Sequence, residues 1–193
     1  MHRASDRPAA TSVPIHPDVA ARWSPRAFDP NIELPHEDLV ALLEAARWAA
    51  TWGGRQPVRF VVGLRGDETF VTVAGLLRRG NSYAQAASAL ILVCADDGPD
   101  DKTALYSKVD AGAAMANLSV EAVSRGLIVH PMAGFDAPGA SAAFSLSDTL
   151  RPLAVIAVGT LGDYAQLSPE VADRDARPRE RLPLGQVVLN WPV

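Results

Sequence analysis

The sequence ALILVCAD, residues 89–96, is a run of seven apolar residues that ends at an aspartate. The run does not alternate between polar and apolar positions, and it is shorter than an ordinary buried helix. These features favour a β-strand that is buried on both faces, because a strand with one solvated face alternates in polarity. Such a strand requires a packed layer on each side of its sheet. The run therefore predicts a central strand with helices on both faces.

Three other stretches have the composition of strands: VRFVVGL at 58–64, LIVHPMAGF at 127–135 and PLAVIAVGTL at 152–161. Helical patterns separate them, at residues 16–23, 34–50, 67–80, 103–126 and 137–146. Two of these helices are expected to end at glycines, at Gly80 and at Gly126, and Gly126 is expected as a C-cap. Helices and strands do not alternate strictly. We therefore predict one α+β domain over residues 16–193, preceded by a flexible arm at 1–15.

Composition excludes several classes of protein. The net charge is −4 and the isoelectric point is near 5.5, which argues against nucleic-acid binding as the main role. No apolar run approaches the ~18–20 residues of a membrane helix, and the first residues lack the apolar core of a secretory signal. We therefore expect a cytoplasmic protein.

The side chains that often carry chemistry form no familiar motif. Cys94 is the single cysteine and lies within the apolar run, where a structural role is expected. The histidines are scattered without the spacing of metal ligands, at positions 2, 16, 36 and 130. Neither a G-x-S-x-G motif nor a P-loop is present. We therefore expect no metal site and assign no catalytic side chain. The chemistry would belong to a bound cofactor.

Two pairs of arginines stand near opposite ends of the chain. Arg22 and Arg26 flank a serine in RWSPRAF, and Arg179 and Arg181 lie in RPRERLPL. Guanidinium groups bind phosphate oxygens bidentately, so the pairs suit recognition of a phosphate monoester. Each pair alone also suits a solvated surface. The phosphate interpretation requires that the two ends of the chain meet.

The order of motifs resembles the FMN-dependent nitroreductase family over residues 20–184. The motifs are RWSPRAFDPN, a long helix, RQPVRFVV, ALILVCAD, DAGAAMANLSVEAVSRGL, HPMAGFD, PLAVIAVG and RERLPL. The resemblance implies a central mixed β-sheet flanked by helices in an intertwined homodimer. It also implies that the FMN phosphate is held by the segments at the two chain ends, through Arg22, Ser24, Arg26, Arg179 and Arg181, and that Trp23 belongs to the cofactor-binding residues.

The resemblance implies two further groups of cofactor-binding residues. The loop TWGGRQP would face the flavin of the partner subunit through Thr51, Trp52, Gly54 and Gln56. It departs from the family pattern because the usual asparagine is Gly54 and because Trp52 is unusual. Trp52 would lie near the flavin ring or substrate opening, or else pack as an aromatic residue at an interface. The other group would lie at the ring itself: Asn81, Pro131, Met132, Ala133 and Gly134.

The function implied by the resemblance is hydride transfer. FMN would accept hydride at N5 from NADH or NADPH and reduce a nitroaromatic or quinone acceptor in a ping-pong reaction. Alternatives are another redox reaction on the same fold, such as dehydrogenation or reductive dehalogenation, and flavin binding without turnover. Water would protonate many acceptors, so no general acid is required.

The apolar tail LGQVVLNWPV, residues 184–193, bears on assembly. If QVVLNW forms a strand, it would leave a hydrophobic edge exposed on an isolated subunit. We therefore expect this tail to join the sheet of the partner in a homodimer, with FMN sites at the interface. The alternative is a tail folded back on its own subunit.

Overall fold

The computed structural model describes residues 7–190 of the chain. Its four-stranded sheet contains β1 (Val58–Leu64), β2 (Ala89–Asp96), β3 (Ile128–Met132) and β4 (Leu150–Gly159), in the spatial order β1-β2-β4-β3. Every pairing is antiparallel. The predicted strands are therefore present, but a mixed sheet is wrong for the described residues. The connections, several of them helical, return the chain so that each strand runs opposite to its neighbour.

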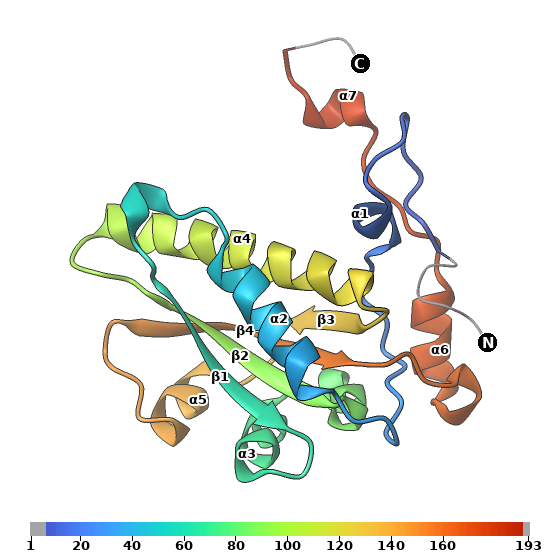
Figure 1. The fold of residues 1–193 in the computed structure, drawn as a ribbon, viewed down its shortest axis with the longest axis horizontal. Coiled ribbons are helices and arrows are strands. Elements are labelled where there is room, and N and C mark those ends of the chain that lie inside the picture. Colours follow the sequence, from blue (N-terminus) through green and yellow to red (C-terminus); the bar gives the residue numbers. More distant parts are fainter. Residues whose placement is uncertain (1–6, 191–193) are drawn as a thin grey trace.

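Helices cover both faces of this sheet (Figure 1). One face packs against α2 (His36–Arg47) and the long α4 (Asp101–Ser124), and the other packs against α3 (Glu68–Leu76) and α5 (Ala137–Ala143). Side chains of β2 alternate between the two cores: Ile91 and Val93 face α2 and α4, while Leu90 and Leu92 face α3 and α5. The α+β prediction is confirmed, and β2 is buried on both faces as expected.

Side chains at the helix ends account for several boundaries. The carboxylate of Asp100 accepts the backbone N–H of Thr103 at 2.8 Å and so caps the start of α4. The carboxylate of Asp67 does the same for Phe70 at the start of α3, at 2.6 Å. After α4, Gly126 adopts a positive φ of 73°, the conformation that glycine supplies beyond a helix end.

The helix expected to end at Gly80 ends earlier. α3 stops at Leu76 because Leu77 is extended and forms a β-bridge with Phe135. The backbone N–H of Arg78 then donates to the carbonyl of Gly134 at 2.9 Å. Residues Arg79–Ala86 continue as the 3₁₀ segment η3. Pairing with a distant segment therefore overrides the local helical preference here.

The two chain ends run side by side at one end of the molecule (Figure 1). The N-terminal side contributes α1 (Pro17–Ala21), and the C-terminal side contributes η4 (Tyr164–Gln166), α6 (Pro169–Ala176) and α7 (Leu184–Val187). A strand over QVVLNW is wrong for its described part, since Gln186 and Val187 belong to α7 and residues 188–190 pair with no strand. Trp191 lies outside the described residues.

The tail extends away from the body of the subunit, with α7 standing clear of the sheet and its helices (Figure 1). Its apolar side chains are largely exposed, including Val187 at 61% and Leu189 at 92%, and the preceding Leu182 is 66% exposed. Within residues 7–190, no helix combines the length and apolar character needed to cross a membrane.

The contact between β1 and α3 yields a test of the fold. A Cβ atom added at Gly63 in β1 would lie 2.4 Å from the backbone nitrogen of Phe70 in α3. A Cβ atom added at Gly75, also in α3, would meet nothing within 4 Å. We expect Gly63→Ala to lower the free energy of unfolding by about 1–3 kcal/mol, because α3 must shift. Gly75→Ala, the matched control, should raise it by about 0.5–1 kcal/mol. Urea denaturation measures both values, and equal effects would contradict the packing described for β1 and α3.

Candidate functional site

An arginine-lined pocket of about 430 Å³ lies where the two chain ends meet. This meeting is the condition that the phosphate interpretation required. The pocket contains all five residues predicted for the phosphate together with Trp23, and it adds others that sequence reasoning missed. Its lining residues are Arg7, Arg22, Trp23, Ser24, Arg26, Arg174, Asp175, Arg177, Pro178, Arg179, Glu180 and Arg181. We call this site the arginine pocket.

Positive charge in the arginine pocket is only partly balanced. Burial, followed by the nearby Arg181 guanidinium, lowers the pKa of Arg22. Burial also lowers the pKa of Arg179, with further contributions from Arg22, Arg7 and Arg181. Each of these shifts disfavours the charged form. A bound anion would relieve this mutual repulsion.

Some of these guanidinium groups hold the chain ends together. Arg179 donates to the carbonyl oxygens of Ala20 at 3.0 Å and Arg22 at 2.7 Å, and also to that of Arg7. Arg7 in turn donates to the carbonyl oxygens of Asp175 and Arg177. These bonds join the N-terminal segment, residues 7–26, to the C-terminal segment, residues 164–181. They identify Arg7 and Arg179 chiefly as structural contacts in this pocket.

Other guanidinium groups remain available for a ligand. Within residues 7–190, the Arg22 side chain has no hydrogen-bond partner, and Arg181 donates only to the adjacent Glu180 carbonyl, at 2.8 Å. The buried Nε of Arg26 also lacks a partner among these residues. Unpartnered donors beside a serine hydroxyl in a positively charged pocket match the chemistry of a phosphate group.

Below the arginine pocket, His130 joins β3 to the N-terminal segment. Its Nδ1 lies 3.0 Å from the carbonyl oxygen of Pro25, and its ring is tilted against Tyr83 with 5.1 Å between centroids. Burial lowers the pKa of His130, so the neutral imidazole is favoured. The neutral ring can donate its Nδ1 proton to the carbonyl. Burial likewise raises the pKa of Tyr83 to about 12. These groups position the segment that carries Ser24 and Arg26.

The turn after β3 meets η3, and this contact brings Asn81 and Gly134 together. The Asn81 side-chain amide donates to the carbonyl of Gly134 at 2.9 Å. A Cβ atom on Gly134 would lie only 2.7 Å from that amide nitrogen, so a larger residue there would displace the Asn81 amide. Pro131 and Ala133 are exposed, whereas Met132 is buried in the core against α3 and α5. In this subunit Met132 contributes to the core, and its neighbours form the accessible part of the turn.

The loop TWGGRQP lies elsewhere, beside the first half of α4. The backbone N–H of Trp52 donates to both carboxylate oxygens of Asp110, at 3.0 and 3.2 Å. Its ring stacks on Tyr106 with 4.9 Å between centroids, and the Lys102 ammonium lies 5.4 Å from the ring centroid. Gly53 and Gly54 both have positive φ, which turns the loop back toward β1. Trp52 is thus a packed aromatic residue within this subunit.

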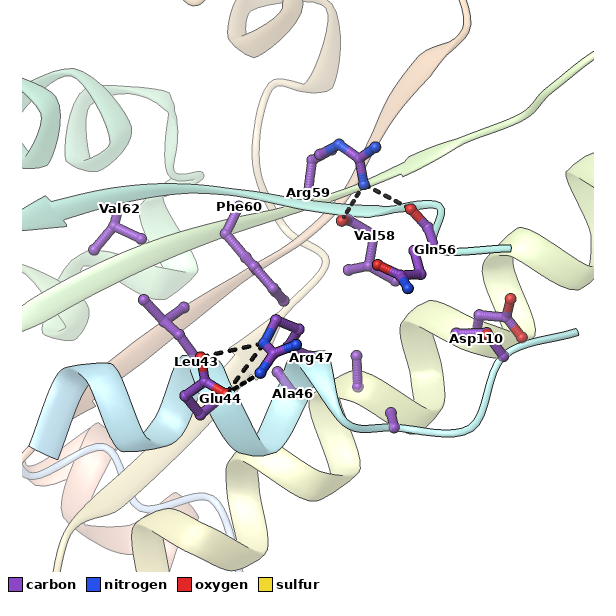
Figure 2. A pocket seen from close by; sticks show the side chains of 13 residues that line it. Leu43, Glu44, Ala46, Arg47, Gln56, Val58, Arg59, Phe60, Val62 and Asp110 are labelled. Carbon is purple, nitrogen blue, oxygen red and sulfur yellow. Dashed lines mark hydrogen bonds and ion pairs between the residues drawn. The ribbon is translucent and has the colours of Figure 1, made fainter. Parts of the chain in front are cut away.

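Thr51 and Gln56 border a second cavity, of about 380 Å³, between α2, β1 and α4 (Figure 2). Phe60 and Val62 from β1 and Leu43 from α2 give it an apolar lining, and the Glu44–Arg47 ion pair lies at one side. Within residues 7–190, β1 pairs only with β2, so the other edge of β1 is unpaired beside this cavity. We call it the β1 groove.

The predicted cofactor residues therefore form two separate groups in one subunit. The chain segments that form the arginine pocket, beside α1 and α6, lie toward the C-terminal end of α4, whereas the loop between α2 and β1 lies beside its N-terminal half (Figure 1). The 24 residues of α4 correspond to about 36 Å at 1.5 Å per residue. The subunit does not bring these two groups together.

Comparison with known proteins places this arrangement in a family. The model of the nitroreductase family matches residues 19–76 and 68–160. An uncharacterized 15.4 kDa protein in the ask 5′ region of Mycolicibacterium smegmatis is 63% identical over 141 residues, which cover 69% of this chain and 95% of that protein.

Two solved structures share the fold. An oxidoreductase containing FMN is 32% identical, with a TM-score of 0.88 and coverage of 98% of this chain and 97% of that one. A nitroreductase family protein from Clostridium difficile 630 is 25% identical, with a TM-score of 0.69 and coverage of 89% and 95%. Since the family model matches most of the chain, this protein belongs to the nitroreductase family.

Proposed function

We propose that this protein is an FMN-dependent oxidoreductase whose arginine pocket binds the cofactor phosphate. The observation that carries the proposal is the accumulation of partly buried guanidinium groups, with unpartnered donors, where the chain ends meet. The similar oxidoreductase that contains FMN supports this choice among phosphate ligands. When bound, FMN would accept hydride from NADH or NADPH and transfer electrons to a nitroaromatic or quinone acceptor.

The residues present fit the phosphate of FMN. Arg22 and Arg181 come from opposite chain ends, and together they would bind a dianion between them with charge-assisted hydrogen bonds. Ser24 would supply a hydroxyl donor from the same segment as Arg22. Arg179 and Arg7 hold this arrangement by bonding to backbone carbonyls.

The turn after β3 is the part of the subunit best suited to the flavin ring. Gly134 and Asn81 hold the turn in a fixed conformation, and the adjacent Ala133 is exposed. In this proposal the backbone of Ala133–Gly134 and the amide of Asn81 orient the ring. No side chain there is required to act as a general acid.

We propose further that the functional unit is a homodimer. Thr51, Trp52 and Gln56 are remote from the arginine pocket of their own subunit, so they would contact the cofactor bound by a partner. The exposed apolar tail and the apolar β1 groove with its unpaired strand edge favour the same assembly. The tail of each subunit would cover the groove of the other.

The proposed activity predicts a yellow protein. We expect purified protein to show oxidised-flavin absorbance and to release FMN, not FAD, on denaturation. It should also oxidise NADH or NADPH with nitrofurazone or menadione as acceptor. A colourless protein that does not take up added FMN would contradict the central proposal. A yellow protein without turnover would instead indicate flavin binding alone.

The phosphate assignment predicts a selective loss of affinity. Arg22→Ala and Arg181→Ala should each weaken FMN binding roughly ten- to hundredfold, as expected for loss of a charge-assisted hydrogen bond of about 1.5–3 kcal/mol. Riboflavin, which lacks the phosphate, should bind nearly as before. Arg151→Ala is the matched control, since Arg151 is an exposed partner of Asp97 outside the pocket. Unchanged FMN affinity in both pocket variants would refute the assignment.

The proposed assembly predicts a dimer that depends on the tail. Light scattering should give twice the mass of the chain, and deletion of residues 185–193 should lower both dimer stability and FMN occupancy. The reason is that exposed apolar side chains would lose their partner surface. A monomer that retains stoichiometric FMN would rule out sharing of the site between subunits.

A further inference from the structure

Asp175 is a buried carboxylate beside the arginine pocket that the family resemblance did not identify. It lies near the end of α6, and 1% of its side chain is exposed. Burying a charged group is unfavourable unless the group is paired and hydrogen-bonded. The buried position is therefore informative, because an aspartate on the exposed surface of α6 would cost less free energy than a buried one.

Both oxygens of Asp175 are bonded, and two of the three bonds that they accept from residues 7–190 involve Arg26. One oxygen accepts the backbone N–H of Arg26 at 2.6 Å and the Tyr164 hydroxyl at 3.0 Å. The other accepts Nη1 of Arg26 at 2.5 Å. The carboxylate thus fixes the main chain and the side chain of Arg26 at the same time.

The Tyr164 hydroxyl is suited to its supporting contact. Burial, followed by the negative charge of Asp175, raises the pKa of Tyr164 far above its ordinary value. The hydroxyl therefore stays protonated and donates to the carboxylate. Tyr164 belongs to η4 and Asp175 to α6, so this bond lies within the C-terminal segment. The bonds to Arg26, in contrast, cross to the N-terminal segment.

Through Arg26, Asp175 controls the relative placement of the two sides of the arginine pocket. Arg26 follows Ser24 and Arg22 in the N-terminal segment, while Asp175 precedes Arg179 and Arg181 in the C-terminal segment. The guanidinium of Arg26 also lies 5.6 Å from the centroid of the Tyr83 ring, and its side chain is 19% exposed. Loss of the carboxylate would leave this largely buried cation without its counter-ion. It would also remove one of the contacts that join the two segments, leaving those of Arg7 and Arg179.

We propose that Asp175 is a positioning residue for the phosphate in the arginine pocket, and that it acts through Arg26. This inference rests on the proposed binding of FMN.

A carboxylate beside an anion site would ordinarily oppose anion binding. If Asp175 served only to reduce positive charge, its removal would strengthen phosphate binding. If it positions the donors, its removal weakens phosphate binding. The two roles therefore predict opposite signs.

The first experiment compares cofactor affinities in a double-mutant cycle. Asp175→Asn keeps the shape of the side chain but removes its charge. We expect it to weaken FMN binding at least tenfold while changing riboflavin binding less than twofold. In protein that already carries Arg26→Gln, Asp175→Asn should change FMN affinity less than threefold, because residues acting through one contact are not additive. Tighter FMN binding by Asp175→Asn, or independent effects in the cycle, would overturn the proposal.

Tyr164→Phe is the matched control, since it removes a bond to the same carboxylate and leaves the Arg26 contact in place. We expect its FMN affinity to stay within threefold of wild type. A loss as large as that of Asp175→Asn would show that general stability of the C-terminal segment, not Arg26, is responsible, and would overturn the proposal.

A second experiment uses the protein without added ligand. Trypsin should cleave after Arg179 and Arg181 at least fivefold faster in Asp175→Asn and Arg26→Gln than in wild type or Tyr164→Phe. Equal cleavage in all four proteins would overturn the proposal, even if FMN binding were absent. Wild-type protein that binds neither FMN nor riboflavin would instead refute the proposed function. If Asp175→Asn does not fold, the cleavage experiment decides: cleavage must be at least fivefold faster in Arg26→Gln than in Tyr164→Phe, and equal rates in these two proteins would overturn the proposal.

Discussion

Burial of β2 on both faces is the constraint from which the arrangement of this subunit follows. A strand that is apolar throughout cannot lie at a solvated face, so the chain must supply two helical layers. Residues of β2 alternate between a core beneath α2 and α4 and a core above α3 and α5. The long α4 then crosses the sheet, with the two chain ends near its C-terminal end and the loop between α2 and β1 beside its N-terminal half.

The arginine pocket carries an electrostatic cost that the fold offsets in two ways. Backbone carbonyls from both chain ends accept the guanidinium protons of Arg7 and Arg179. Asp175 provides a buried counter-charge for Arg26. These contacts leave Arg22 and Arg181 near one another without comparable compensation, and burial, followed by the Arg181 guanidinium, lowers the pKa of Arg22. An assembly of like charges that persists after such compensation is a suitable site for an anionic ligand.

Much of the secondary structure was predictable because local patterns and tertiary packing agree. The strand at 89–96 and the capped helix before Gly126 are examples. Prediction was wrong where distant contacts decide the conformation. The helix at 67–80 ends early because Leu77 pairs with Phe135. The β-like QVVLNW differs from this case: its described part has no strand to pair with and begins within α7.

The arginine pairs were identifiable from sequence because their residue types suit a phosphate, but their meeting depends on tertiary structure. Asp175 could not be identified in this way. It stands among the alternating charges of RDARPRER, which look like solvated surface, and only the fold shows that this one carboxylate is buried against Arg26.

The arginine pocket and the TWGGRQP loop are separated in one subunit, and this separation bears on how the protein would function. A single subunit holds the arginine pocket at one end of α4 and the TWGGRQP loop toward the other, so a cofactor held by the first group cannot contact the second within that subunit. A twofold axis that pairs two copies of α4 in opposite directions would bring each loop toward the pocket of the other subunit. The exposed apolar residues Leu105 and Val109 on α4 are suited to such a contact. In the proposed homodimer the cofactor site and the subunit interface would form one structural unit, so binding at one would stabilise the other.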